Sequence, residues 1–241
     1  MLTIVNISQS VYQLLQTALI ISQINYKIVD DDLPIDKLYI DNNNLILSVG
    51  GSIEFNCDYY YNQVILTRLG KKNLLSRLIN QQQKLSPDLT VLDMFAGFGS
   101  DGFMFLSHNC EVTAIEVNPY IFLVLSYFNT LYYQQFQQKM TLHYYDCYQW
   151  LLHKNNDFNI YYLDPMFNSN KKSLPRKSMQ VIAYFSRFND RDIIVDLFDF
   201  IKNSTVIVKR DNKQPPIAFS KKIKPNFSLS SKLIRFDLYL L

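Results

Sequence analysis

Glycine, cysteine and histidine are scarce in this chain. Only six of its 241 residues are glycine, about a third of the average usage of ~7%, so a cluster of glycines is informative. The three cysteines, Cys57, Cys110 and Cys147, lie too far apart for a zinc motif or for the disulfide framework of a small secreted domain. None of the three histidines belongs to an HExxH pattern. The sequence therefore predicts thiols without disulfides, and no metal site.

Long hydrophobic runs are also missing. Uninterrupted apolar runs stay near five residues, as at 121–125, whereas a helix that crosses a bilayer needs about 20. The first 15 residues lack the basic segment and the small-residue cleavage site of a secretory signal. With 48% hydrophobic residues, the chain can build one large domain or a domain with a small appendage. These features predict a soluble, cytoplasmic protein without membrane contact.

Positive charge is distributed unevenly along the chain. The net charge is only +3, yet residues 1–58 carry a balance of −5 and residues 202–235 a balance of +8. Residues 168–180 add four basic side chains and no acidic one. This pattern favours a polyanionic partner. The charge alone also fits a solvated, lysine-rich face.

The N-terminal part is predicted to be a small α+β subdomain. Its apolar periodicity and its Asp/Asn-rich turn indicate a strand at 2–7, a helix at 10–24 and a hairpin at 37–51, followed by a helix near 72–83. We expect this subdomain to span residues 1–65 and a larger domain to span residues 66–241.

From residue 89 onward, apolar strands alternate with helices. The expected strands are at 89–95, 110–118, 140–146, 158–165 and 204–210, and the expected helices include 119–136, a helix through Trp150, and 191–201. The last 15 residues are predicted to form one or two strands that run antiparallel to the others. Such alternation predicts an α/β fold with a mostly parallel sheet covered by helices on both faces.

The first chemical signal is a glycine motif after the strand at 89–95. Gly97, Gly99 and Gly102 form the pattern GxGxxG at the start of an expected helix, where backbone N–H groups can approach a ligand closely. Glu116 ends the next strand, and its carboxylate can accept hydrogen bonds from the hydroxyl groups of a ribose. This arrangement fits NAD and S-adenosyl-L-methionine (SAM) alike. Asp93 favours SAM, because an acid at this position suits a cationic methionine group and repels a pyrophosphate.

The second signal is the sequence Asp-Pro-Met-Phe after the fourth expected strand. An exocyclic amino group on a base is a poor nucleophile, because its lone pair is delocalised into the ring. The Asp164 carboxylate and the Pro165 carbonyl can accept hydrogen bonds from the two N–H groups of such an amine, and Phe167 can stack on an extruded base. Proline restricts the local backbone, which favours a preorganised pair of acceptors. These three residues are the candidate catalytic group.

The two signals together resemble class I SAM-dependent methyltransferases of the RsmJ type. This family methylates N2 of a guanosine in the 16S rRNA of the small ribosomal subunit. The matching stretches are DMFAGFGSDGF, AIEVNP, YLDPMFNSNKKSLPRKSM, VIVKR with PP at 215–216, and IRFDLY. The chain departs from the family pattern at Ser100, where arginine is usual, at Asn168 and Asp211, and at 67–78, where Gly70 stands in place of a glycine run.

The resemblance implies a class I, Rossmann-like fold with an antiparallel C-terminal strand, SAM as the cofactor, and an rRNA methyltransferase activity. It also implies cofactor contacts at Ser100, Asp101, Glu116, Val117, Asp146, Cys147 and Asp164. In this interpretation Asp101 lies beside the methionine amino group, Glu116 binds the ribose and Asp146 accepts from the adenine amino group. Cys147 offers a small side chain and a backbone N–H, but it could equally be a plain buried thiol.

Basic residues near the ends of the late strands are the candidate RNA contacts. Their positive charges suit phosphates, which position an RNA without reading its sequence. The candidates are Lys171, Lys172, Arg176, Lys177, Lys209, Arg210 and Arg235. The implied partner is 16S rRNA or the small subunit, recognised by shape with one base splayed out. The protein is expected to be a monomer or a weak dimer.

Three other functions remain open. The Asp-Pro-x-aromatic chemistry also serves methylation of an adenine amino group in DNA or RNA. The glycine motif with Glu116 fits a nicotinamide-dependent oxidoreductase, although no convincing His/Lys proton-transfer set accompanies it. A non-catalytic RNA-binding assembly factor would need neither reaction.

Overall fold

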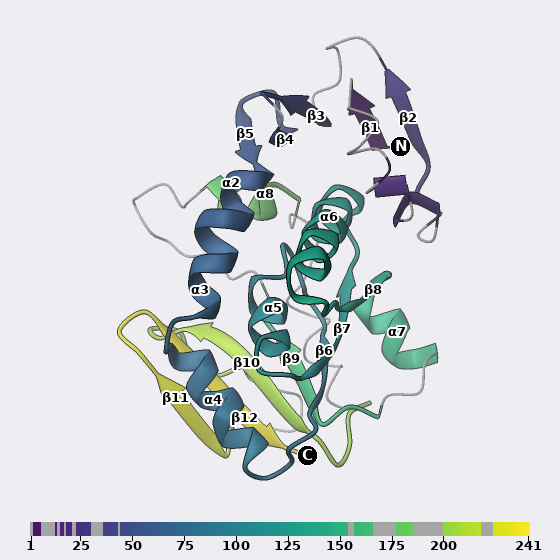
Figure 1. The fold of residues 1–241 in the computed structure, drawn as a ribbon. Helices are drawn as coiled ribbons and strands as arrows, with labels where there is room; N and C mark the ends of the chain where they lie inside the picture. The colour runs from purple at the N-terminus through teal and green to yellow at the C-terminus, as the bar shows by residue number, and fades with distance from the viewer. Residues whose placement is uncertain are drawn as a thin grey trace.

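The protein consists of two sheets joined by a run of helices (Figure 1). The computed structural model describes residues 2–5, 13, 15–16, 18–20, 23–29, 36–42, 44–153, 157–165, 177–185, 200–217 and 224–241. The helices within these ranges are α2 (Cys57–Tyr60), the π-helix η1 (Tyr61–Leu66), α3 (Thr67–Leu69), α4 (Leu74–Gln83), α5 (Ser100–Leu106), α6 (Pro119–Phe136), α7 (Cys147–His153) and α8 (Lys177–Phe185).

The larger sheet has seven strands in the order β11-β12-β10-β9-β6-β7-β8. Their bounds are β6 (Thr90–Asp93), β7 (Glu111–Glu116), β8 (Thr141–Tyr144), β9 (Ile160–Leu163), β10 (Thr205–Asp211), β11 (Phe227–Ser230) and β12 (Ile234–Leu240). Strands β6 to β10 are parallel, while β12 runs antiparallel to both β10 and β11. The predicted α/β fold with an antiparallel C-terminal strand is confirmed.

At the centre of this sheet, both faces are buried. In β9, Ile160 and Tyr162 belong to one hydrophobic core, whereas Tyr161 and Leu163 belong to a second core on the opposite face. Because side chains alternate between the faces of a strand, a strand covered on both sides is apolar at every position. This is why β9 appears in the sequence as a continuous apolar run.

Helix α6 shows how local sequence sets the boundaries of an element. Asn118 caps its first turn by accepting from the backbone N–H groups of Tyr120 and Ile121, and Pro119 occupies the first turn. Gln137 ends the helix in the left-handed conformation. The helix predicted at 119–136 is confirmed.

The smaller sheet contains five strands in the order β2-β1-β3-β4-β5. Their bounds are β1 (Leu2–Val5), β2 (Tyr26–Val29), β3 (Lys37–Asp41), β4 (Asn44–Val49) and β5 (Ile53–Asn56). The predicted hairpin corresponds to β3 and β4, and the described residues 13, 15–16 and 18–20 of the predicted helix 10–24 are helical. Strands β2 and β5 had no clear sequence signal.

The helical run from α2 to α3 connects the two sheets and passes through residue 65, the expected boundary. At its start, the Asp58 carboxylate accepts from the Leu45 backbone N–H (2.6 Å) and from the Tyr127 hydroxyl (2.6 Å). These bonds tie β4 to α6. The smaller sheet is therefore fastened to the larger domain by a charge-assisted contact.

Phe98 continues this connection into the glycine motif. Its ring stacks on Phe55 of β5 with 4.6 Å between centroids, and it also contacts Tyr60 and Phe128. Since Phe98 lies between Gly97 and Gly99, the smaller sheet packs directly on the turn that precedes α5.

Two further elements differ from expectation or cannot be compared with it. Helix α8 was not predicted, and nearly all of the helix expected at 191–201 lies outside the described residues. Within the described ranges, no helix combines the length and the apolar character needed to span a bilayer.

The glycine turn generates a stability prediction. Gly99 has φ +73°, and an added Cβ would come within 2.5 Å of Leu125 Cδ1. Gly99→Ala should lower the free energy of unfolding by about 2–4 kcal/mol, because a left-handed conformation costs about 1–2 kcal/mol and crowding adds to it. Urea unfolding measures the change.

Gly51→Ala is the matched control, because Gly51 has φ +65° with open space around the Cβ position. It should lose only the conformational part, about 1–2 kcal/mol. Equal losses in the two variants would contradict the role given to the close approach of Leu125.

Candidate functional site

Polar side chains gather where the carboxyl ends of the central parallel strands meet. Asp93 is the last residue of β6, Glu116 is the last residue of β7, and Asp164 follows β9 directly. Strand order reverses at β6, which pairs with β7 on one side and with β9 on the other. In open α/β sheets this switch point is where ligands bind.

The glycine turn holds the Glu116 carboxylate in place. The backbone N–H of Gly97 donates to Oε2 (3.0 Å), and the backbone N–H of Asn118 donates to Oε1 (2.7 Å). Gly97 and Gly99 both have positive φ, which shapes the turn for these contacts. An acceptor fixed at the end of the second parallel strand suits the hydroxyl groups of a ribose.

A network of charges joins β9, β10 and α5. The Lys209 ammonium lies 2.6 Å from Asp164 Oδ2 and 2.7 Å from Asp101 Oδ2. Asp101 also accepts from the Arg68 guanidinium and, at 2.6 Å, from the Tyr162 hydroxyl. Two cations and two carboxylates thus balance each other in a largely buried cluster.

The ionisation of this cluster follows from its contacts. Burial raises the pKa of Asp101, but Lys209 and Arg68 outweigh burial and bring that pKa below its usual range. Burial lowers the pKa of Lys209, whereas Asp101 and Asp164 raise it above its ordinary value. The ammonium therefore stays protonated. Asp164 remains 36% exposed in its side chain, so it is the member of the cluster that a substrate can reach.

Asp93 differs from the other carboxylates of the site in having a buried oxygen without a hydrogen-bond partner among the described residues. This oxygen is Oδ1, and the residue is 2% exposed. Burial, followed by repulsion from Asp101 and Asp164, raises the pKa of Asp93 well above its ordinary value. A buried carboxyl group in this state favours a cationic or hydrogen-bond-donating ligand.

The other expected cofactor residues have varied surroundings. Ser100 accepts from Arg68, and Val117 is 60% exposed beside Glu116. Asp146 uses Oδ1 to cap α7 by accepting from the Gln149 backbone N–H (2.9 Å). Cys147 is a buried thiol at the start of α7. Among the candidate catalytic residues, Pro165 is buried beside Asp164, and Phe167 lies outside the described residues.

At three of the expected RNA-contact positions, the side chains have partners within the protein. Lys209 lies in the charge network rather than at a phosphate-binding surface. Arg210 is 9% exposed and donates to the Pro215 carbonyl (2.8 Å), and Arg235 pairs with Asp237 (2.7 Å) and donates to the Gln214 carbonyl (3.0 Å). The two arginines therefore hold the loop after β10.

The remaining basic candidates follow the Asp-Pro-Met-Phe sequence. Lys177 is exposed at the start of α8, whereas Lys171, Lys172 and Arg176 lie outside the described residues.

Sequence reasoning missed Arg68 and Tyr162. Tyr162 had an available signal, because it lies two residues before Asp164 and residues at this spacing share a face of a strand. Arg68 had none, because it is separated from Asp101 by 33 positions and reaches it only through the fold.

Comparison with known proteins identifies the family of this chain. A profile of the family described as "Putative SAM-dependent methyltransferase" matches residues 37–241. The chain belongs to this family. The methyltransferase assignment decides between the two cofactors that fit the glycine motif, and SAM is the cofactor.

Individual relatives agree with the family. "Ribosomal RNA small subunit methyltransferase J" from Francisella tularensis subsp. holarctica is 29% identical over 214 residues, which cover 84% of this methyltransferase and 86% of that protein. A protein of the same name from Marinobacter nauticus is 31% identical over 182 residues, covering 70% of this chain and 63% of that one.

A solved structure has the same fold. The SAM-dependent methyltransferase from Neisseria gonorrhoeae superposes with a TM-score of 0.70 over 100% of this chain and 96% of that one, at 20% identity.

The site fits the chemical groups of SAM. The Oδ1 oxygen of Asp93 suits the positively charged methionine part, and the fixed carboxylate of Glu116 suits the ribose. Asp101, expected beside the methionine amino group, accepts from Arg68, Tyr162 and Lys209. Across the described residues, no group of three or more His, Cys, Asp or Glu side chains could hold a metal.

Asp93 generates a pH-dependent prediction. Its folded pKa is above the unfolded value of about 3.9, so above about pH 4 the carboxyl group ionises in the unfolded chain but stays protonated in the folded one, and the ligand-free protein loses stability as the pH rises. Asp93→Asn removes this loss. The free energy of unfolding of the variant relative to wild type should therefore increase with pH, by at most about 1.4 kcal/mol per pH unit.

Urea unfolding of the ligand-free protein at several pH values above 4 measures this difference. Asp88→Asn, at an exposed carboxylate that precedes β6, is the control for removing one acid. A difference between Asp93→Asn and wild type that does not vary with pH would contradict the assignment.

Proposed function

We propose that this methyltransferase transfers a methyl group from SAM to the exocyclic N2 amino group of a guanosine in 16S rRNA of the small ribosomal subunit. The observation that carries the proposal is the partly exposed Asp164 carboxylate, which follows β9 at the switch point and is bound by Lys209. The relatives that share most of the chain are named as methyltransferases of small-subunit rRNA.

The proposed chemistry depends on acceptors for an amino group. SAM, when bound, supplies the activated methyl group. Asp164 and the Pro165 carbonyl would accept hydrogen bonds from the two N–H groups of the guanine amine. These hydrogen bonds localise the lone pair on the nitrogen and make the nitrogen a better nucleophile. As the methyl group leaves the sulfonium, which would become the neutral thioether of adenosylhomocysteine, and bonds to the nitrogen, one amine proton must leave, and Asp164 could accept it.

Lys209 gives this step an electrostatic requirement. Its ammonium is shared between Asp164 and Asp101, so Asp164 is oriented before a substrate arrives. An amine that binds at Asp164 would donate to the same carboxylate as Lys209. Because Lys209 keeps its contact with Asp101, it can move relative to Asp164 without losing both partners.

The wider features of the protein are part of the same proposal. We infer a cytoplasmic monomer or weak dimer, with residues 66–241 carrying the reaction and residues 1–65 supporting it. Phe167, Lys171, Lys172, Arg176 and Lys177 are proposed to contact the RNA near the target base.

Product analysis tests the reaction and the atom together. Purified protein is incubated with methyl-labelled SAM and small subunits that lack the modification, and the digested rRNA is analysed for labelled nucleosides. We expect N2-methylguanosine. Labelled methyladenosine would overturn the choice of base, and absence of label despite binding of adenosylhomocysteine would overturn the proposed substrate.

Replacement of Asp164 tests its place in the reaction. Asp164→Asn should lower kcat/KM by at least about 100-fold, because the charged acceptor is lost. The affinity for adenosylhomocysteine, measured by calorimetry, should change far less. The exposed Asp88→Asn variant should keep full activity. Unchanged turnover in Asp164→Asn would exclude the proposed role of Asp164 in the reaction.

A further inference from the structure

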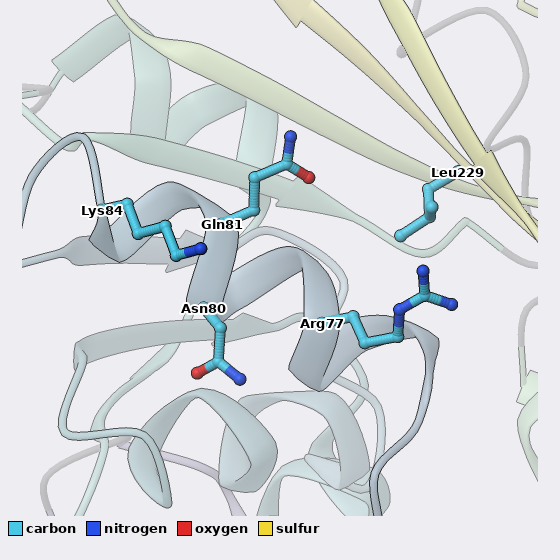
Figure 2. A pocket seen from close by; sticks show the side chains of 5 residues that line it. All are labelled: Arg77, Asn80, Gln81, Lys84 and Leu229. Atoms are coloured by element: carbon cyan, nitrogen blue, oxygen red, sulfur yellow. The ribbon is translucent and has the colours of Figure 1, made fainter.

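A groove between α4 and the edge strand β11 lies outside the reaction site. Figure 2 shows three polar side chains of α4 and that of Lys84, which caps its C-terminus, with Leu229 of β11 on the other side. The volume of the groove is about 430 Å³. It is lined by Arg77, Asn80, Gln81, Lys84 and Leu229, and none of these side chains is acidic.

The polar residues form one face of α4. Arg77, Asn80, Gln81 and Lys84 recur at the helical spacing of three and four residues, and all are exposed. The opposite face, which includes Leu75, Leu78 and Ile79, is buried in the core. The packing of α4 is thus complete without the groove face.

Further cations extend this surface at both ends. Lys71 and Lys72 precede α4, and Lys224 and Lys232 flank β11; all four are exposed. We name these four lysines, together with Arg77 and Lys84, the α4–β11 basic surface. Within the described part of the chain, no hydrogen bond or ion pair involves the charged end of any of the six.

Folding does not account for this clustering. The N-terminus of a helix carries a partial positive charge and favours acids nearby. The first turn of α4 contains no acid, and Lys71 and Lys72 lie just before it. Like charges collected without partners favour an external polyanion.

The surface begins next to the reaction site. Arg68, at the end of the helical run, donates to Asp101 in the charge network, and Lys71 follows only three residues later. Helix α4 then leads away along β11, which it contacts. An RNA whose target base reaches Asp164 could therefore continue across this surface.

We propose that the α4–β11 basic surface binds the phosphate backbone of a folded part of the substrate RNA, away from the methylated nucleotide. Arg77 and Lys84 contact phosphates about 10 Å apart along the helix, and the amides of Asn80 and Gln81 donate to phosphate or 2′-hydroxyl oxygens. This inference rests on the proposed function, which names the RNA but not its docking surface.

A charge-reversal experiment tests the surface. The double variant Arg77→Glu/Lys84→Glu is compared with Lys139→Glu/Lys202→Glu, which changes the net charge equally at exposed lysines outside the surface. Binding to unmodified 16S rRNA transcript is measured between about 50 and 200 mM salt. Adenosylhomocysteine affinity shows that each variant retains its fold.

The Arg77→Glu/Lys84→Glu variant, called the groove variant below, should bind the transcript at least about tenfold more weakly at low salt. The slope of log affinity against log salt should become shallower by about 2. Its KM for RNA should rise while kcat stays near the wild-type value. Equal losses in the two double variants would overturn the docking surface.

Methylation of rRNA by the wild-type protein separates the two proposals. If wild type methylates rRNA and the groove variant matches the control, the docking surface alone is overturned. If wild type neither binds nor methylates rRNA, the proposed function fails, and the docking surface fails with it.

Discussion

The site depends on one ammonium group placed between two carboxylates. Lys209 of β10 contacts Asp164 after β9 and Asp101 in α5, so a single side chain joins three elements at the switch point of the sheet. Two acids this close and this buried repel each other without a cation between them. In a partly buried cluster, removing one partner leaves a charge whose burial costs several kcal/mol. The positions of Asp164 and Asp101 are therefore a consequence of where Lys209 lies.

The N-terminal part of the chain completes this arrangement from outside the sheet. Arg68 supplies the second cation to Asp101, and Phe98 of the glycine turn packs on Phe55 of the smaller sheet. Asp58 joins the same region to α6 through Tyr127. The smaller sheet and the helical run thus support the turn and the charge network together.

The parallel sheet and its motifs were predictable because their signals are local. A strand buried on both faces is apolar throughout, as β9 is, and α6 has its own cap and its own stop. The smaller sheet was less predictable. Its strands β2 and β5 have four residues each and include the charged Lys27 and Glu54, so they lack the continuous apolar run that makes the equally short β9 recognisable. Helix α8 follows a proline-containing basic segment and had no comparable signal.

Local sequence patterns were enough to predict the alternation of strands and helices, the glycine turn, Glu116 at the end of β7 and Asp164 at the end of β9. Each of these follows from residues that are close neighbours in the chain. Which charges meet, in contrast, depends on how the chain folds in three dimensions. Lys209, Arg210 and Arg235 look alike in sequence as basic residues of late strands, but the first holds the catalytic candidate and the other two hold a loop. Electrostatic partners are selected by distance in space, and Lys209 is separated from Asp101 by 108 positions, a pairing that no local pattern encodes.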